Sequence, residues 1–209
     1  MHSLIKEELQ KSRELIIAIQ ANDALLKTAD AIARRCVDAL KKGGKILFAG
    51  NGGSAADSQH LAAELVCRLS YNRPAMAALA LTTDTSALTA ISNDYSFEYL
   101  FARQVEAIGQ SGDVLIGIST SGKSPNILRA LETARAKGLV TVGFSGQSAP
   151  LLAERCELVL NIPSQETPKI QEGHILFGHI ICAVVEEILY GADYNPAYKM
   201  AAAGGNFAL

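Results

Sequence analysis

Two short segments of this 209-residue chain carry side chains that handle metal ions and protons. His60 and Glu64 are four positions apart, which places them one turn apart on one face of a helix. Gln171 and His179 are eight positions apart, so they differ by only about 80° around a helix axis and can face one cleft. Imidazole, carboxylate and amide oxygen atoms bind divalent metals, and Glu and His are also common proton-transfer groups. The spacing therefore predicts a site for metal binding, acid–base chemistry or both.

Two turns rich in glycine and serine accompany these segments, one just before His60 and the other between the two segments. The first, Gly-Asn-Gly-Gly-Ser at 50–54, has three glycines that let the backbone approach a ligand closely. The second, at 119–125, joins an apolar run to an amphipathic segment, with Ser124 as a possible helix cap and Pro125 at the first helical position. Free backbone N–H groups would then face an anion in the turn. Four hydroxyls there exceed what a cap needs: Ser119, Thr120, Ser121 and Ser124. Together the turns predict a site for a small phosphorylated substrate.

The second turn also matches G-x-x-x-x-G-K-[ST], the phosphate-loop pattern of nucleotide triphosphatases, over residues 117–124. We disfavour this interpretation because Gly117 would lie inside a strand instead of opening the turn. A triphosphatase would also leave the His60–Glu64 and Gln171–His179 pairs unexplained. Dinucleotide binding is disfavoured too, because no Asp or Glu ends the second predicted strand, where a ribose would bind.

The rest of the chain must supply the helices and strands that position these groups. Apolar periodicity predicts two initial helices, over 3–21 and 23–42. The strands are predicted at 45–50, 77–81, 113–118, 140–144 and 158–162. The later helices are predicted at 54–69, 85–91, 125–137 and 168–190. Continuous apolar strands separated by helices indicate an α/β three-layer sandwich, with a five-stranded parallel sheet covered on both faces. Ligands bind such sheets beyond the carboxyl ends of the strands, where both turns fall.

Composition excludes several classes of function. The chain is 49% hydrophobic and 19% charged with a net charge of −2, so it can bury a large core and has no basic surface for nucleic acid or membrane. We expect neither a signal peptide nor an apolar run near the roughly 20 residues that span a bilayer. The cysteines form no C-x-x-C pair, which is typical of a reduced cytoplasmic protein: Cys36, Cys67, Cys156 and Cys182. We expect one domain over 1–190, and a tail over 191–209 that is loose or, less favoured, packs on a neighbouring subunit.

These residues, in this order, resemble the sugar isomerase (SIS) domain family, and within it the bacterial isomerases of sedoheptulose 7-phosphate. The matching blocks lie at 50–54, 60–64, 72–74, 93–94, 112–122 and 170–179. The resemblance implies a flavodoxin-like sheet, with N-terminal helices for oligomerisation, in a cytoplasmic homotetramer whose active sites lie between subunits. It also implies interconversion of sedoheptulose 7-phosphate and D-glycero-D-manno-heptose 7-phosphate. That reaction is the first step toward ADP- or GDP-heptose for lipopolysaccharide core or surface glycans.

Carried over residue by residue, the resemblance assigns three roles. Glu64 and His179 would be the catalytic base and its acid–base partner, acting through an enediol. One zinc ion per subunit would be held by His60, Glu64, Gln171 and His179. The substrate would contact Glu64, Gln171 and the remaining matched positions: Asn51, Gly52, Gly53, Ser54, Arg68, Asn93, Asp94, Ser119, Thr120, Ser121 and Ser124. No nucleic acid or membrane partner is expected.

Two other functions stay open within the same family. Some members are non-catalytic and bind the bacterial replication initiator, but they lack the full acid–base set, whereas Glu64 and His179 are both present here. A sugar-phosphate sensor in a regulator would need a DNA-binding segment, and the N-terminal helices instead suggest an oligomerisation pair. Lys123 and Pro168 depart from residues that relatives often carry. His174 is expected to be a packed or interface residue, and Glu172 to form a structural ion pair.

Overall fold

The structure is a computed structural model that describes residues 2–197 of the chain. A five-stranded parallel sheet with strand order β2-β1-β3-β4-β5 forms its centre. The strands are β1 (Ile46–Gly50), β2 (Ala78–Ala80), β3 (Val114–Ile118), β4 (Val140–Ser145) and β5 (Leu158–Asn161). All five correspond to predicted strands, and their order is that of a flavodoxin-like sheet. The predicted α/β fold class is therefore confirmed.

Helices connect the strands and extend the chain at both ends. They are α1 (His2–Gln20), α2 (Asp23–Lys41), α3 (Gly53–Val66), α4 (Thr85–Asp94), α5 (Ala102–Ile108), α6 (Pro125–Ala136), α7 (Pro150–Ala153) and α8 (Thr167–Tyr194), with a 3₁₀ turn η1 (Phe97–Tyr99). The sequence did not predict η1, α5 or α7, because segments of seven residues or fewer are too short to show a helical period. Three helix ends also differ from prediction by three residues or more. The helix expected to reach residue 69 ends at Val66, the helix expected to end at residue 91 continues to Asp94, and the last helix continues to Tyr194.

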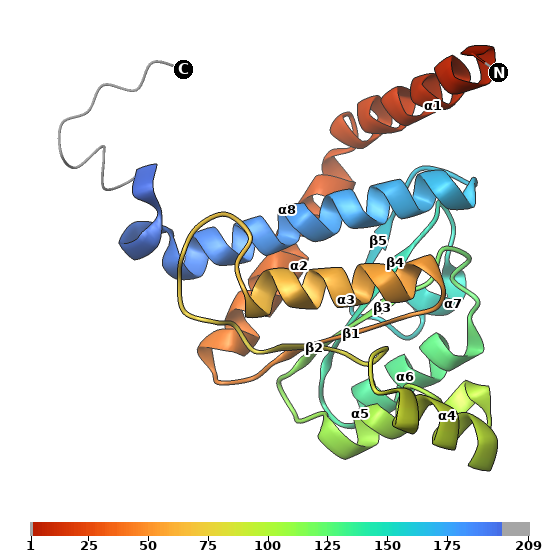
Figure 1. Ribbon diagram of the computed structural model, residues 1–209, viewed down its shortest axis with the longest axis vertical. Coiled ribbons are helices and arrows are strands. Elements are labelled where there is room, and N and C mark those ends of the chain that lie inside the picture. Colours follow the sequence, from red (N-terminus) through yellow and green to blue (C-terminus); the bar gives the residue numbers. More distant parts are fainter. Residues whose placement is uncertain (1, 198–209) are drawn as a thin grey trace.

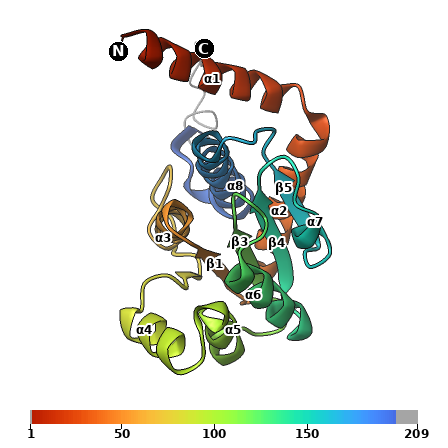
Figure 2. The same ribbon diagram turned by 90° about the vertical axis from the view of Figure 1, so that its right-hand side faces the viewer.

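The helices cover the sheet on both faces and give the predicted three layers (Figures 1 and 2). Helices α2, α3 and α8 pack on one face, and α5, α6 and α7 pack on the other. Alternate residues of β1 point to opposite layers. Ile46 and Phe48 belong to the first core, and Leu47 and Ala49 belong to the second. A strand buried on both faces must be apolar throughout, which is why these strands were visible in the sequence.

Helix α1 projects away from the rest of the chain (Figure 1). Leu15 and Ile19 near its C-terminal end are buried, whereas Leu4, Ile5 and Leu9 are 58%, 56% and 66% exposed. Apolar side chains that gather on an exposed helix commonly mark a surface for another protein chain. The N-terminal part of α1 therefore presents an apolar surface that the core of the described chain does not cover.

Helix α8 is long and apolar enough to cross a membrane by length and composition alone, which is weak evidence because core helices pass the same test. It packs against α2 and α3, with Phe177, Ile181 and Val185 buried in the first core. These contacts are those of a core helix in this fold. The predicted tail over 191–209 begins inside α8, since residues 191–194 are helical. Residues 198–209 lie outside the described part of the chain, and with them most of that prediction.

Candidate active site

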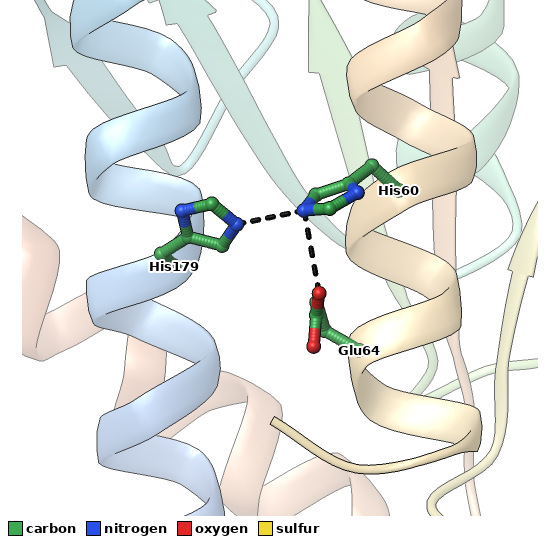
Figure 3. Close-up of side chains that lie close together, drawn as sticks. All are labelled: His60, Glu64 and His179. Atoms are coloured by element: carbon green, nitrogen blue, oxygen red, sulfur yellow. Dashed lines mark hydrogen bonds and ion pairs between the residues drawn. The ribbon is translucent and has the colours of Figure 1, made fainter. Parts of the chain in front are cut away.

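Helices α3 and α8 lie side by side and bring together three of the four predicted metal ligands (Figure 3). His60 Nε2 lies 2.7 Å from His179 Nε2 and 3.3 Å from Glu64 Oε1. The ligand atoms of all three side chains lie within 4.8 Å of one another. In Figure 3 the two imidazole rings point toward each other across the gap between the helices, and Glu64 lies one turn along α3. The site is therefore assembled by tertiary packing of two distant segments.

A glycine allows α3 and α8 to approach closely enough for this pairing. Gly178 precedes His179 on α8, and Leu61 follows His60 on α3. A Cβ placed on Gly178 would lie 2.5 Å from Cδ2 and 2.6 Å from Cδ1 of Leu61. Because Gly178 has no side chain, Leu61 packs directly on the backbone of α8. The neighbouring histidines consequently come within hydrogen-bonding distance.

These three side chains fit a divalent metal ion. Two imidazole nitrogens and a carboxylate oxygen form a donor set typical of zinc, although other divalent metals use the same groups. The 3.3 Å between His60 Nε2 and Glu64 Oε1 equals the spacing of two ligands about 2.0–2.1 Å from one tetrahedral ion. At 2.7 Å the two histidines share a hydrogen bond, in which one imidazole donates and the other accepts. A bound cation would require this pair to open by about 0.6 Å.

Gln171, the fourth predicted ligand, contacts the first glycine-rich turn in this structure. A Cβ placed on Gly53 would lie 2.5 Å from Nε2 of Gln171. Gly53 begins α3 and precedes His60 by seven residues, a rise of about 10 Å along the helix. The side chains of Gln171 and His179 both face α3, as their spacing suggested, but at different levels. The role of Gln171 as a metal ligand stays a prediction.

Asp57 adds a carboxylate beside the histidine pair, and sequence reasoning missed it. It lies one turn before His60 on α3, and its Oδ2 is buried without a hydrogen-bond partner among residues 2–197. Burial raises the pKa of Asp57, while the neighbouring His60 and His179 act in the opposite direction. The D-x-x-H spacing on one helical face could have found this residue. Its position adds acidic character close to the candidate metal site.

The second turn joins β3 to α6 and leaves the helix N-terminus free of side-chain caps. Ser124 is the N-cap residue and Pro125 is the first residue of α6, as predicted. The Ser124 hydroxyl does not cap the helix but lies 2.9 Å from the Ser119 hydroxyl. Gly122 adopts a φ of +65°, which bends the turn back toward β4. Pro125 has no N–H, and the N–H groups of Ile127 and Leu128 donate to the Ser124 carbonyl oxygen. The Asn126 N–H and the Thr120 hydroxyl, for which no hydrogen bond is found within residues 2–197, thus remain available to an anion.

A cavity of about 320 Å³ opens beside the second turn. One wall comes from the turn itself, and the others come from the loops after β4 and β5 and from the start of α8. The lining residues are Thr120, Ser121, Lys123, Gly146, Gln147, Ser148, Ser164, Gln165 and Ile170. A volume of this size is within the range of small-molecule sites. Sequence reasoning missed the walls after β4 and β5, because those loops carry no recognisable motif.

The first turn follows β1 and is fixed by a partner that sequence reasoning missed. Asn51 Nδ2 donates to Asn126 Oδ1 at 2.9 Å, and Asn126 Nδ2 donates to Asn51 Oδ1 at 2.8 Å. Gly52 has a φ of +56° and leads into Gly53 at the start of α3. Ser54, another predicted substrate contact, is buried at 3% exposure. The first turn therefore offers mainly Asn51 and glycine backbone to a ligand.

The other predicted substrate contacts are Arg68, Asn93 and Asp94. Arg68 is exposed in the loop that follows α3. Asn93 donates to Asp94 at 2.8 Å where α4 ends. Across the part of the chain that the structure describes, no hydrogen bond links these three residues to the turns or to the histidine pair. Their assignment to the substrate stays a prediction.

Two neighbouring residues of α8 have structural surroundings, as expected. His174 is fully buried, and its Nε2 lies 3.1 Å from the carbonyl oxygen of Ser145. Burial lowers the pKa of His174 to about 4, so the imidazole is neutral at pH 7. Glu172 accepts hydrogen bonds from Lys169 Nζ at 2.8 Å and from Ser12 Oγ at 2.7 Å. The predictions of a packed histidine and a structural ion pair are therefore confirmed.

Comparison with known proteins gives consistent matches. The sequence model of the SIS domain matches residues 9–146. The chain is 52% identical over 187 residues to a phosphoheptose isomerase of Burkholderia pseudomallei (strain 1710b), covering 90% of this chain and 95% of that relative. It is 50% identical over 190 residues to a phosphoheptose isomerase of Aneurinibacillus thermoaerophilus, covering 91% and 96%. Phosphoheptose isomerase GmhA from Neisseria gonorrhoeae is similar in structure, with a TM-score of 0.83, 38% identity, and coverage of 89% of this chain and 98% of that one.

Proposed function

This chain belongs to the SIS domain family and is an isomerase of a phosphorylated heptose, and we propose that it interconverts sedoheptulose 7-phosphate and D-glycero-D-manno-heptose 7-phosphate. The product would enter ADP- or GDP-heptose synthesis for surface glycans. The convergence of Glu64 and His179 between α3 and α8 is the observation that carries the mechanism. The non-catalytic alternative receives no support, because the residues of an acid–base pair are present and meet in space.

The reaction moves hydrogen between two adjacent carbons and between their two oxygens. In the ketose, Glu64 takes a proton from C1 while His179 donates a proton to the carbonyl oxygen on C2, which gives an enediol. Glu64 then returns its proton to C2, and His179 recovers one from the hydroxyl on C1, which becomes the aldehyde. Both side chains end in their starting protonation states. The Glu64 side chain is 19% exposed, so its carboxylate can reach a ligand while remaining largely shielded from water.

We propose that one zinc ion per subunit is held by His60, Glu64 and His179, with Gln171 as a fourth ligand. The donor set of two imidazoles and a carboxylate supports a divalent metal, and the buried, unpaired oxygen of Asp57 lies on the same helix one turn before His60. When bound, such an ion polarises a substrate carbonyl and helps hold adjacent oxygens. The residues of the chain still have to orient the sugar and move the protons.

Phosphate recognition is assigned to the turn before α6. The hydroxyls of Ser119, Thr120, Ser121 and Ser124 and the free N–H of Asn126 at the start of α6 would hold the phosphate. Asn51 and the backbone of Gly52 and Gly53 would contact the sugar, together with Ser54, Arg68, Asn93 and Asp94 as further predicted contacts. The first glycine of the triphosphatase pattern, Gly117, lies inside β3, and Lys123 is exposed. Both observations favour a sugar-phosphate cradle over a nucleotide loop.

We also propose that the protein acts as a cytoplasmic homotetramer with active sites between subunits. The uncovered apolar side chains of α1 support association with other copies of the chain. The His60 side chain is 49% exposed, which leaves one side of the site open to a neighbouring subunit. Size-exclusion chromatography with light scattering tests this assignment, and a monomer at micromolar concentration would contradict it.

The function is tested by incubating the protein with sedoheptulose 7-phosphate and following the aldose 7-phosphate by NMR. Ser119→Ala combined with Ser121→Ala should raise KM strongly, because two donors of the phosphate cradle are lost. Lys123→Asn is the matched control in the same turn and should leave turnover largely intact. Absence of the aldose product with folded, metal-loaded protein would overturn the proposed substrate. ATP hydrolysis that disappears in Lys123→Asn would overturn the assignment of the turn.

A further inference from the structure

The amide pair formed by Asn51 and Asn126 connects the two ligand-binding turns. We propose that Asn126 is a positioning residue that orients the Asn51 amide for sugar binding and ties the sugar turn to the phosphate turn. This inference rests on the proposed function, in which Asn51 contacts the sugar. Asn126 itself is only 1% exposed, so it acts through Asn51 and not by touching the substrate.

The position of each asparagine explains the coupling. Asn51 directly follows β1, and β1 pairs with β3 so that Gly50 lies opposite Ile118. Asn126 lies in the first turn of α6, two residues after Ser124 of the phosphate turn. The two hydrogen bonds, at 2.9 and 2.8 Å, therefore cross between the ends of neighbouring strands. The distance between a phosphate bound at one turn and a sugar bound at the other is set partly by this pair.

The hydrogen-bonding capacity of the amides assigns their roles. A primary amide has two N–H donors and two acceptor sites on its oxygen. The reciprocal pair uses one donor and one acceptor site of each residue, and no other hydrogen bond of the Asn51 side chain is found within residues 2–197. Asn51 thus keeps one N–H and one acceptor site for sugar hydroxyls, in a plane that Asn126 fixes. Without Asn126, that amide could rotate, and its orienting contribution would be lost.

Asn126→Leu tests the proposal because leucine fills a similar volume but forms no hydrogen bond. We expect kcat/KM for sedoheptulose 7-phosphate to fall by about 10- to 100-fold, as a misplaced positioning group would cause. The inhibition constant of inorganic phosphate should stay within about twofold of the parent, since the hydroxyls and the N-terminus of α6 remain. Asn161→Leu, the same substitution at an exposed strand end, is the matched control and should change neither value.

A double-mutant cycle separates positioning through Asn51 from a general structural role. If Asn126 acts through Asn51, adding Asn126→Ala to Asn51→Ala should change kcat/KM by less than about twofold. Independent losses that multiply in the double variant would overturn the proposal. So would full activity of Asn126→Leu, or a loss of phosphate affinity as large as its loss of kcat/KM. A parent enzyme inactive on sedoheptulose 7-phosphate would instead refute the proposed function, so the two failures are distinguishable.

Discussion

Gly178→Ala should weaken the active site without altering any catalytic side chain. The new Cβ would lie 2.5 and 2.6 Å from the two δ-carbons of Leu61, whereas carbon atoms in contact prefer about 3.5–4.0 Å. Helices α3 and α8 must therefore separate by about 1 Å, or Leu61 must leave its rotamer. Overpacking of this kind costs about 1–3 kcal/mol, and the better helix propensity of alanine returns up to about 1 kcal/mol. We expect a net loss of about 0–2 kcal/mol in unfolding free energy.

The effect on activity should exceed the effect on stability. His60 and His179 flank the Gly178–Leu61 contact, so a shift of about 1 Å moves one catalytic helix relative to the other and should lower kcat/KM by about 10²-fold. Steady-state isomerisation and urea unfolding measure the two effects separately. The matched control is Gly191→Ala on the same helix, where the nearest atoms to the added Cβ belong to the carboxylate of Glu187, at the far end of a side chain, and not to a packed core residue. The kcat/KM of Gly191→Ala should match that of the parent enzyme.

A compensating substitution sharpens this test. Leu61→Ala removes the atoms that the new Cβ would strike, so the double variant should recover part of the lost activity despite its smaller core. Parental kcat/KM and stability in Gly178→Ala would refute the argument that close helix packing sets the histidine pair. The same conclusion would follow if Gly191→Ala lost as much activity as Gly178→Ala.

Three further predictions concern stability and metal binding. Burial lowers the pKa of His174 to about 4, so between about pH 6.5 and pH 4 the imidazole binds a proton in the unfolded chain but not in the folded protein. The unfolding free energy should therefore drop by about 3 kcal/mol as the pH falls through this range. Urea unfolding of His174→Gln at the same pH values should lack that drop. Glu186→Ala should cost about 3–5 kcal/mol in urea unfolding, because it leaves the buried Arg73 guanidinium without its partner at 2.9 Å. Chelation should lower activity without changing circular dichroism, and His60→Ala should lower metal content by elemental analysis; unchanged metal content would contradict the site.

The long elements and part of the site could be predicted because their signals are local. β1 is apolar at every position, and His60 and Glu64 show helical spacing within one segment. The contact between His60 and His179 spans 119 positions, so it depends on how α3 and α8 pack. For the same reason, the roles of Asn126 and Gly178 could not be predicted from the sequence. An asparagine after a Ser-Pro cap, or a glycine before a histidine, has no role in sequence until the neighbouring element is in place.

The central claim is that Glu64 moves the proton between the two sugar carbons. The most direct measurement compares the turnover of sedoheptulose 7-phosphate by the parent and by Glu64→Gln, with the aldose product followed by NMR. The amide keeps the shape of the side chain but cannot accept the proton, so we predict a loss of at least about 10²-fold in kcat with folding unchanged. Turnover by Glu64→Gln within a few-fold of the parent would contradict this account.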